Sequence, residues 1–475
     1  MIDLSKYRKI HCIGIGGIGL SAVAEILMSK GYEVSGSDMR ESDITENLMD
    51  KGAKIFLGHR AKNVENADLV VYTVAVGDDN PEIARAKELG IPTVTRAQAL
   101  GALMEQYEHS IAISGTHGKT TTTSMISLIL KHDNKMPTIL VGGNLDEIGG
   151  NVYVGDKHYF VTEACEYRDS FLQLRPSVEI ILNIDSDHLD YFKDVEHIAR
   201  SFDKFARLVP PNGIVIAYDG NAFVKSVIEG LPNAVTFGLN TGSDYYASNI
   251  SFSREGMPQF DVNHGGQVLC RIELSIPGEH NILNALAAFA CCHMLGVRPE
   301  AIVKTLNEFK GTHRRFDVLG RTQTNVGIVD DYAHHPTEIK ATLAAVKKMR
   351  HGDLWCLFQP HTYTRTLALM DDFAKAFDMA DKIVLAEIYP AREKNIYKIS
   401  SSVLMEKIKE HDPTKEVYFF KEFDEIAEFV YANAKPQDMV LTMGAGDIYK
   451  VGEMMLEMEK PQGKKTAREY KKIED

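Results

Sequence analysis

Residues 110–123 read Ser-Ile-Ala-Ile-Ser-Gly-Thr-His-Gly-Lys-Thr-Thr-Thr-Thr, which predicts a strand, a glycine-bounded turn and the start of a helix. This is the layout of a loop that binds a nucleoside triphosphate. Glycines let the backbone approach the phosphates, the lysine can reach the β- and γ-phosphate oxygens, and the next threonine can ligate Mg²⁺. The residues expected to bind the triphosphate are Gly115, Thr116, His117, Gly118, Lys119, Thr120 and Thr121.

The spacing of this loop is shorter than usual. The common motif has a glycine five residues before Gly118, but Ile113 stands there and Gly115 follows instead. The alternative is a chance Gly-Lys-Thr on a surface loop. The apolar strand before the loop, and Met125 and Leu128 at helical spacing after it, favour a phosphate-binding loop.

Length, charge and cysteine usage limit the class of protein. A chain of 475 residues predicts about three domains, and 44% hydrophobic residues without a membrane-length apolar run predict a soluble globular protein without membrane insertion. The first residues lack a signal-peptide core, so we expect a cytoplasmic protein. Six cysteines without Cys-x-x-Cys spacing argue against zinc or disulfides. The net charge of −13 argues against general nucleic-acid binding.

A second glycine motif lies in the predicted first domain, residues 1–105. Residues 9–19 predict a strand that enters Gly-x-Gly-x-x-Gly, and a second strand at 33–37 ends on Asp38, where a dinucleotide fold places its ribose-binding acid. Alone, this motif suggests a nicotinamide-dependent oxidoreductase. Its glycines also suit any diphosphate, and an oxidoreductase would not need the phosphate loop at 115–120. The ligand of this domain therefore stays open at this point.

The predicted central domain, residues 106–312, places further polar groups near the phosphate loop. A strand at 159–162 ends on Glu163, and a strand at 178–183 leads to His188. Because ligands of parallel sheets lie at the carboxyl ends of the strands, both side chains are candidate Mg²⁺ ligands. The alternative for His188 is a histidine that caps a turn. Residues 244–276 alternate in polarity and predict antiparallel strands.

Asn281 and Asn284 lie three residues apart at the start of a predicted helix and so share a face. Their carboxamides could bind an adenine edge or a phosphate-bound water, or one of them could cap the helix. In the predicted third domain, residues 313–475, strands again end on polar groups, among them His361 and Arg365. Arginine can hold a phosphate or a carboxylate with two hydrogen bonds. From Glu459 onward we expect a solvated tail.

Six motifs, in order over nearly the whole chain, resemble those of the Mur ligase family. They are Gly-Ile-Gly-Gly-Ile-Gly-Leu-Ser at 14–21, Gly-Thr-His-Gly-Lys-Thr-Thr-Thr-Thr at 115–123, Asp-His-Leu-Asp at 187–190, Gly-Glu-His-Asn-Ile-Leu-Asn-Ala at 278–285, Arg-Arg-Phe at 314–316 and Asp-Asp-Tyr-Ala-His-His-Pro-Thr-Glu at 330–338. The resemblance implies three α/β domains: a Rossmann-like UDP-binding domain, a central P-loop ATPase-like domain with a mostly parallel sheet, and a C-terminal Rossmann-like domain. It also implies an ATP- and Mg²⁺-dependent ligase that adds L-alanine to UDP-N-acetylmuramate in peptidoglycan precursor synthesis.

The resemblance also implies roles for individual residues. Thr120, Glu163 and His188 would ligate Mg²⁺, and His361 and Arg365 would receive the amino acid. Arg315 and Asp331 would close over the nucleotide from the third domain. The residues implied in catalysis are Lys119, His188, Asn281, Asn284, Arg315 and Asp331. Those implied to bind the UDP substrate are Gly14, Gly16, Gly17, Gly19, Ser37 and Asp38.

One segment departs from the family pattern. The family commonly reads Glu-Ala-Asp-Glu-Ser-Asp around the metal-binding glutamate, whereas residues 163–168 read Glu-Ala-Cys-Glu-Tyr-Arg. The glutamate is kept, so the departure bears on the substrate-facing loop, and no lysine can be assigned as carbamylated. A ligase that recycles a preformed peptide onto the same sugar nucleotide, and a regulatory P-loop ATPase, remain alternatives. We expect a monomer or weak dimer.

Overall fold

The computed structural model describes residues 2–73, 76–77, 79–188, 191–391 and 393–458. Two residues of the 187–190 motif and the predicted tail from residue 459 lie outside this set. The chain forms two compact units. The first consists of Met1–Asp185, Glu196–Tyr246 and Leu286–Thr305, and the second of Ser186–Val195, Ala247–Ala285 and Leu306–Asp475.

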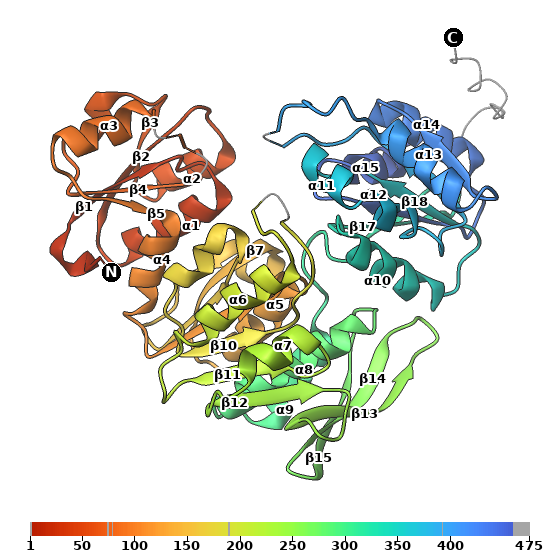
Figure 1. Ribbon diagram of the computed structural model, residues 1–475, viewed down its shortest axis with the longest axis horizontal. Coiled ribbons are helices and arrows are strands. Elements are labelled where there is room, and N and C mark those ends of the chain that lie inside the picture. The colour runs from red at the N-terminus through yellow and green to blue at the C-terminus, as the bar shows by residue number, and fades with distance from the viewer. Residues whose placement is uncertain (1, 74–75, 78, 189–190, 392, 459–475) are drawn as a thin grey trace. The chain divides into compact units, whose positions relative to one another are not determined.

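The N-terminal sheet is parallel and has the strand order β3-β2-β1-β4-β5. Its strands are β1 (Lys9–Ile13), β2 (Glu33–Asp38), β3 (Lys54–Leu57), β4 (Leu69–Tyr72) and β5 (Thr93–Thr95). Its helices are η1 (Leu4–Lys6), α1 (Ile18–Ser29), α2 (Asp43–Asp50), η2 (Ala61–Val64), α3 (Pro81–Glu88) and α4 (Arg96–Met104). Strands and helices alternate along the chain, as Figure 1 shows, and this arrangement places the glycine loop between β1 and α1.

The central sheet is mixed but mostly parallel, with the strand order β15-β14-β13-β12-β11-β10-β6-β9-β7-β8. Its strands are β6 (His109–Ser114), β7 (Thr138–Leu145), β8 (Gly150–Tyr153), β9 (Tyr159–Glu163), β10 (Val178–Ile181), β11 (Ile214–Tyr218), β12 (Ala234–Gly238), β13 (Tyr245–Phe252), β14 (Pro258–His264) and β15 (Gln267–Glu273). The antiparallel pair β14 and β15 confirms the strand pattern predicted for 244–276.

The strand before the phosphate loop lies in the interior of this sheet, because β6 pairs in parallel with β9 on one side and β10 on the other. The carboxyl ends of these three strands therefore meet at one edge. The helices and 3₁₀ turns of this part of the chain are α5 (Lys119–His132), η3 (Asp146–Ile148), η4 (Tyr167–Gln173), α6 (Val195–Ala206), α7 (Ala222–Ile228), α8 (His280–Met294) and α9 (Pro299–Glu308).

The C-terminal sheet has the order β16-β17-β21-β18-β19-β20, and only the edge pair β16 and β17 among its described pairs is antiparallel. Its strands are β16 (Asp317–Arg321), β17 (Gly327–Asp331), β18 (Leu354–Phe358), β19 (Lys382–Leu385), β20 (Glu416–Phe419) and β21 (Met439–Met443). Its helices are α10 (Pro336–Lys347), α11 (Tyr363–Ala368), α12 (Met370–Ala374), α13 (Ser401–His411), α14 (Phe423–Asn433) and α15 (Tyr449–Glu457).

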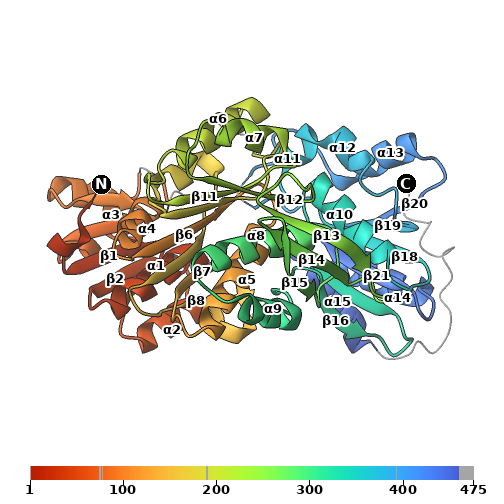
Figure 2. The same cartoon turned by 90° about the horizontal axis from the view of Figure 1, so that it is seen from below.

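Alternation along the fully buried strand β18 builds two cores in this domain. Cys356 and Phe358 join one apolar cluster, with residues of α10, α12 and α13. Trp355 and Leu357 point the other way and join a second cluster, with residues of α14 and α15. Figure 2 shows α12 and α13 on one side of the sheet and α14 and α15 on the other. A strand that is covered on both faces is apolar at every position, as this one is.

The predicted fold class of three α/β domains is confirmed by these sheets. Across the described part of the chain, we find no helix that combines the length and the apolar character needed to cross a membrane.

Candidate functional site

The phosphate loop between β6 and α5 depends on glycine at two positions. Gly115 has φ +136° and Gly118, the residue before α5, has φ +86°, and L side chains rarely adopt either conformation. A Cβ on Gly115 would also lie 2.9 Å from the Cβ of Leu182. Asn183, just after β10, stabilises the turn, because its Oδ1 accepts a hydrogen bond of 2.8 Å from the backbone N–H of His117. The loop is therefore preformed by its glycines and by Asn183.

Lys119 opens α5, and its ammonium group points back into the loop. Nζ donates to the carbonyl oxygens of Gly115 and Thr116, the latter at 3.1 Å. It also lies 3.1 Å from Oε2 of Glu166. Burial is the largest single influence and by itself would lower the pKa of Lys119, but the combined attraction of Glu166 and other nearby acidic groups, Glu163 among them, raises the pKa above its usual value. Lys119 is therefore a charged donor at the phosphate-binding position that the motif predicts.

Glu163 lies at the end of β9, next to the phosphate loop. Its Oε1 accepts a hydrogen bond of 2.6 Å from the backbone N–H of Gly142 on β7. A Cβ at Gly142 would lie 2.7 Å from each carboxylate oxygen of Glu163, so only glycine leaves room for the carboxylate in this position. Carboxylate and hydroxyl oxygens are the ligands that Mg²⁺ prefers, so Glu163 and the buried Thr120 fit a Mg²⁺ ion chemically.

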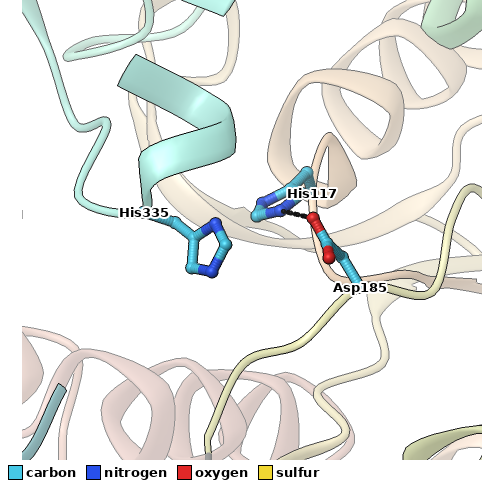
Figure 3. Close-up of side chains that lie close together, drawn as sticks. All are labelled: His117, Asp185 and His335. Carbon is cyan, nitrogen blue, oxygen red and sulfur yellow. Dashed lines mark ion pairs between the residues drawn. The ribbon is translucent and has the colours of Figure 1, made fainter. Parts of the chain in front are cut away.

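His117 lies at the tip of the phosphate loop and faces a second acidic residue. Figure 3 shows its imidazole turned toward Asp185, and Nε2 lies 3.5 Å from Oδ2 of that residue. Asp185 also donates its backbone N–H to Thr116 Oγ1 at 2.9 Å. The segment after β10 thus contacts the loop at His117 and Thr116, and Asp185 is a loop contact that the sequence motif did not single out.

The N-terminal glycine loop is closed by Asp38. The backbone N–H of Gly16 donates to Oδ2 of Asp38 at 2.9 Å, and Gly14 has φ +82°. The glycine loop and Asp38 are thus brought together, as predicted. The side chain of Ser37 faces the interior instead, because its hydroxyl donates to Glu82 at 2.6 Å and it is fully buried. Its hydroxyl is therefore already used inside the protein, which weakens the case for Ser37 as a substrate ligand.

The predicted amino-acid-binding residues lie together in the second unit. Nη1 of Arg365 donates to Nδ1 of His361 at 3.1 Å, so His361 must accept at Nδ1 and carry its proton on Nε2. Burial lowers the pKa of His361 to about 3, with help from the nearby His334 and Arg365, so the ring is neutral. The ring of His361 stacks on Tyr389 with a centroid distance of 5.6 Å. His361 and Arg365 therefore present a neutral imidazole and a cationic guanidinium group side by side.

Asp187 is the counterion of Arg365, a contact that the motif did not predict. Its Oδ1 lies 3.2 Å from Nη2 and 3.3 Å from Nε of Arg365. Burial would raise the pKa of Asp187, but Arg365 and neighbouring histidines hold it well below its usual range. The adjacent His188 has φ +53° and Nε2 lies 3.7 Å from Oδ2 of Asp187. Its role as a metal ligand stays a prediction.

Asp331, at the end of β17, is bound by backbone N–H groups. Its Oδ1 accepts from Ala333 at 2.7 Å and its Oδ2 from Phe316 at 2.9 Å. Burial raises the pKa of Asp331 to about 6, and Arg315 partly offsets this effect. The predicted pair of Arg315 and Asp331 is thus close enough to interact. The guanidinium of Arg315 also lies 5.0 Å from the ring centre of Tyr332.

Asn281 and Asn284 share one face of α8, as the spacing predicted. Nδ2 of Asn284 donates to Oδ1 of Asn281 at 2.9 Å, and Nδ2 of Asn281 donates to the carbonyl of Pro277 at 2.7 Å. Both are buried. These bonds orient the two carboxamides and anchor the start of the helix, and a role toward the nucleotide stays a prediction.

Sequence reasoning assigned no role to the residues that support the predicted ones. Each of them forms a hydrogen bond with a loop or a site residue that no sequence motif specifies. They are Gly142, Glu166, Asn183, Asp185 and Asp187. The signal that could have found Glu166 was its place in the segment that departs from the family pattern.

Three consecutive regions of the chain match sequence families. Residues 9–108 match the Mur ligase family, catalytic domain; residues 113–292 match the Mur ligase middle domain; and residues 314–446 match the Mur ligase, glutamate ligase domain. Together these matches cover most of the chain, and they include both glycine loops and the strand ends of the C-terminal sheet.

Individual proteins are similar over nearly the full length. The chain is 52% identical to UDP-N-acetylmuramate–L-alanine ligase of Alkaliphilus metalliredigens, covering 96% of this chain and 98% of that protein. It is 51% identical to the ligase of the same name from Acetivibrio thermocellus, covering 96% of this chain and 97% of that protein. The solved UDP-N-acetylmuramate–alanine ligase of Thermotoga maritima is 33% identical, with a TM-score of 0.78 over 94% of this chain and 98% of that chain. By these matches, the chain belongs to the Mur ligase family.

Proposed function

We propose that this protein is an ATP-dependent acid–amino-acid ligase that joins L-alanine to UDP-N-acetylmuramate in peptidoglycan precursor synthesis. The observation that carries the proposal is identity of 51–52% to proteins named as this ligase, over 95–97% of the chain. The geometry supports the proposal. The phosphate loop carries the charged Lys119, and beside the loop the carboxylate of Glu163 accepts the N–H of Gly142.

The chemistry requires activation of a carboxylate. A carboxylate is inert toward an amine at neutral pH, so the lactyl carboxylate first takes the γ-phosphoryl group of ATP, which releases ADP. The amine of alanine then attacks the acyl phosphate, and a tetrahedral intermediate expels phosphate. In such a reaction the protein mainly positions the reactants and stabilises charge. Lys119 would place its ammonium group on the transferred phosphoryl oxygens.

Thr120 and Glu163 would hold Mg²⁺ at the phosphate loop. When bound, the ion neutralises part of the phosphate charge, which a chain with a net charge of −13 cannot do by its overall field. Gly142 keeps Glu163 directed by its N–H group. His188 is proposed as a ligand of a second Mg²⁺ ion, in keeping with the family motif at 187–190.

We further propose that the second unit supplies the remaining contacts. Arg315, stacked on Tyr332, and Asp331 would act on the nucleotide, and Asn281 and Asn284 would line its site. His361 and Arg365 would receive the amino acid, with the guanidinium directed at its carboxylate. Asp187 would then limit how far Arg365 can turn toward that carboxylate.

The N-terminal loop would bind the diphosphate of the UDP substrate. Gly14, Gly16, Gly17 and Gly19 surround the start of α1, where backbone N–H groups and the helix dipole favour negative charge. Asp38, which accepts the Gly16 N–H, would bind the ribose hydroxyls.

A peptide-recycling ligase on the same sugar nucleotide is the nearest alternative. The solved murein peptide ligase of Psychrobacter arcticus is 26% identical to this chain with a TM-score of 0.69, both lower than the values for the alanine ligase of Thermotoga maritima. The nicotinamide-dependent alternative is disfavoured because all three regions match ligase families.

A coupled phosphate-release assay tests the proposal. The purified protein is incubated with ATP and Mg²⁺, and phosphate is measured with and without UDP-N-acetylmuramate and L-alanine. We expect release only when both are present. Release with a tripeptide but not with L-alanine would favour the recycling ligase, and release without any acceptor would favour a simple ATPase. Glycine and L-serine in place of L-alanine would give the amino-acid preference.

A further inference from the structure

Glu166 forms an ion pair with Lys119, the lysine of the phosphate loop. Its Oε2 and Oε1 lie 3.1 Å and 3.4 Å from Lys119 Nζ. The Glu166 side chain is 2% exposed, so water does little to screen its charge. A lysine ammonium has three N–H donors, and those of Lys119 are directed at Gly115, Thr116 and Glu166. No donor is left for a phosphate oxygen unless one of these bonds is broken.

The segment that carries Glu166 is anchored to the core. Phe171 packs against Phe202 and Phe205 with ring-centre distances of 5.2 Å and 4.5 Å, and its N–H donates to Cys165 O at 3.1 Å. Asp169, close by, accepts a hydrogen bond from Ser201. Withdrawal of the whole segment would break this packing, so Glu166 can leave Lys119 only by turning its side chain.

We infer that Glu166 competes with the phosphates of ATP for Lys119 and thereby makes nucleotide binding depend on a divalent cation. This inference rests on the proposed function, because it takes Lys119 as the phosphate-binding lysine. Metal-free ATP brings several negative charges toward a buried carboxylate, with Glu163 close enough to add to the same field. Like charges at short range in a poorly screened site repel strongly. A divalent cation on the phosphates reduces that repulsion, so Glu166 selects the metal-bound nucleotide.

Binding of a non-hydrolysable ATP analogue to the Glu166→Gln variant tests the inference. Calorimetric titration at pH 7.5 is run once with Mg²⁺ and once with EDTA, for the wild type and the variant. Glutamine keeps the shape and can still accept from Lys119, but it removes the charge. We expect the variant to bind the metal-free analogue about tenfold more tightly than the wild type, with a smaller change for the Mg²⁺ complex.

Glu179→Gln is the matched control. Glu179 is another fully buried glutamate near the loop, hydrogen-bonded to Ser114 at 3.1 Å, but burial raises its pKa to about 8, so it is largely uncharged in the assay. Its replacement is expected to leave the ratio of metal-bound to metal-free affinity unchanged. If Glu166→Gln does not fold, as judged by thermal unfolding, Glu166→Asp withdraws the charge and should give a smaller gain of the same sign.

The outcomes separate the inference from the proposed function. Wild-type protein that does not bind the Mg²⁺ complex, or a Lys119→Ala variant that binds it as tightly as the wild type, would overturn the assignment of the phosphate loop. Lys119-dependent binding with an unchanged metal requirement in Glu166→Gln and Glu166→Asp would overturn the inference alone. An equal gain in Glu179→Gln would also overturn it.

Discussion

The two glycine loops of this protein carry their charges in opposite ways. In the N-terminal loop an acid, Asp38, accepts directly from a loop N–H at 2.9 Å. In the central loop a cation, Lys119, donates to the loop carbonyls and carries Glu166 as its counterion. A loop that only binds a diphosphate can rely on N–H groups and a helix N-terminus, whereas phosphoryl transfer needs a charged donor that follows the moving group.

The largest effect is expected when the cation of the central loop is removed. Lys119→Ala should lower kcat for phosphate release by about a thousandfold, the scale seen when a charge-stabilising donor is lost. Lys131→Ala, at the other end of α5, is the control and should retain most activity. Circular dichroism checks the fold, and full activity of Lys119→Ala would remove the functional difference between the two loops.

A buried acid beneath the central loop should make stability depend on pH. Burial raises the pKa of Glu179 to about 8 from an ordinary value of 4.5, so the folded state holds this proton more tightly than the unfolded state does. Its contribution is fully present below pH 4.5 and is lost as the pH rises toward 8. From pH 5 to pH 8 the wild type should lose on the order of 3 kcal/mol of unfolding free energy through this group.

The Glu179→Gln variant should lack this loss, because glutamine does not ionise. Urea unfolding of both proteins at pH 5 and pH 8 gives the difference, and other groups that titrate in this range cancel between them. An identical pH dependence in the two proteins would contradict a raised pKa for Glu179.

The metal site proposed at the central loop should be sensitive to the space at one glycine. In Gly142→Ala the new Cβ would lie 2.7 Å from both oxygens of Glu163 and displace the carboxylate. We expect the Mg²⁺ concentration for half-maximal activity to rise about 10- to 100-fold, as for other lost supports of a metal ligand. Gly242→Ala, where nothing lies within 4 Å, is the control. An unchanged Mg²⁺ requirement would contradict the proposal that Glu163 binds the metal.

The smallest effect is expected at the N-terminal loop. Asp38→Ala removes the acceptor of the Gly16 N–H and should raise the KM for UDP-N-acetylmuramate about tenfold, with little change in the KM for ATP. Initial rates at varied concentrations of each substrate measure both. Asp50→Ala, at the end of α2, is the control. A shift in the KM for ATP instead would mean that the two loops do not divide the substrates as proposed.

Much of the fold could be predicted because the signals are local. The glycine spacings, the apolar strands before them and the helical patterns after them all lie within short windows, and β1 to α1 and β6 to α5 formed where expected. The Asn281 and Asn284 pair was predictable for the same reason, since residues three apart share a helix face.

The supporting contacts of the site could not be predicted. Gly142 and Glu163 are separated by 21 residues, and Asp187 and Arg365 by 178. Nothing in a short window specifies which strand end faces which loop. Ser37 illustrates the reverse case: it stands beside Asp38 at a strand end, but alternation along β2 turns its hydroxyl toward Glu82 in the interior.

The sequence by itself determined the α/β class, the two glycine loops and the family motifs, because each depends on residue types at close spacing. Only the tertiary structure decided that Lys119 is paired with Glu166, that Gly142 directs Glu163 and that Arg365 is held by Asp187. The physical reason is that charge and hydrogen-bond pairing act through space. Strand order and packing bring these groups together, and strand order cannot be predicted from residues that are neighbours in the sequence.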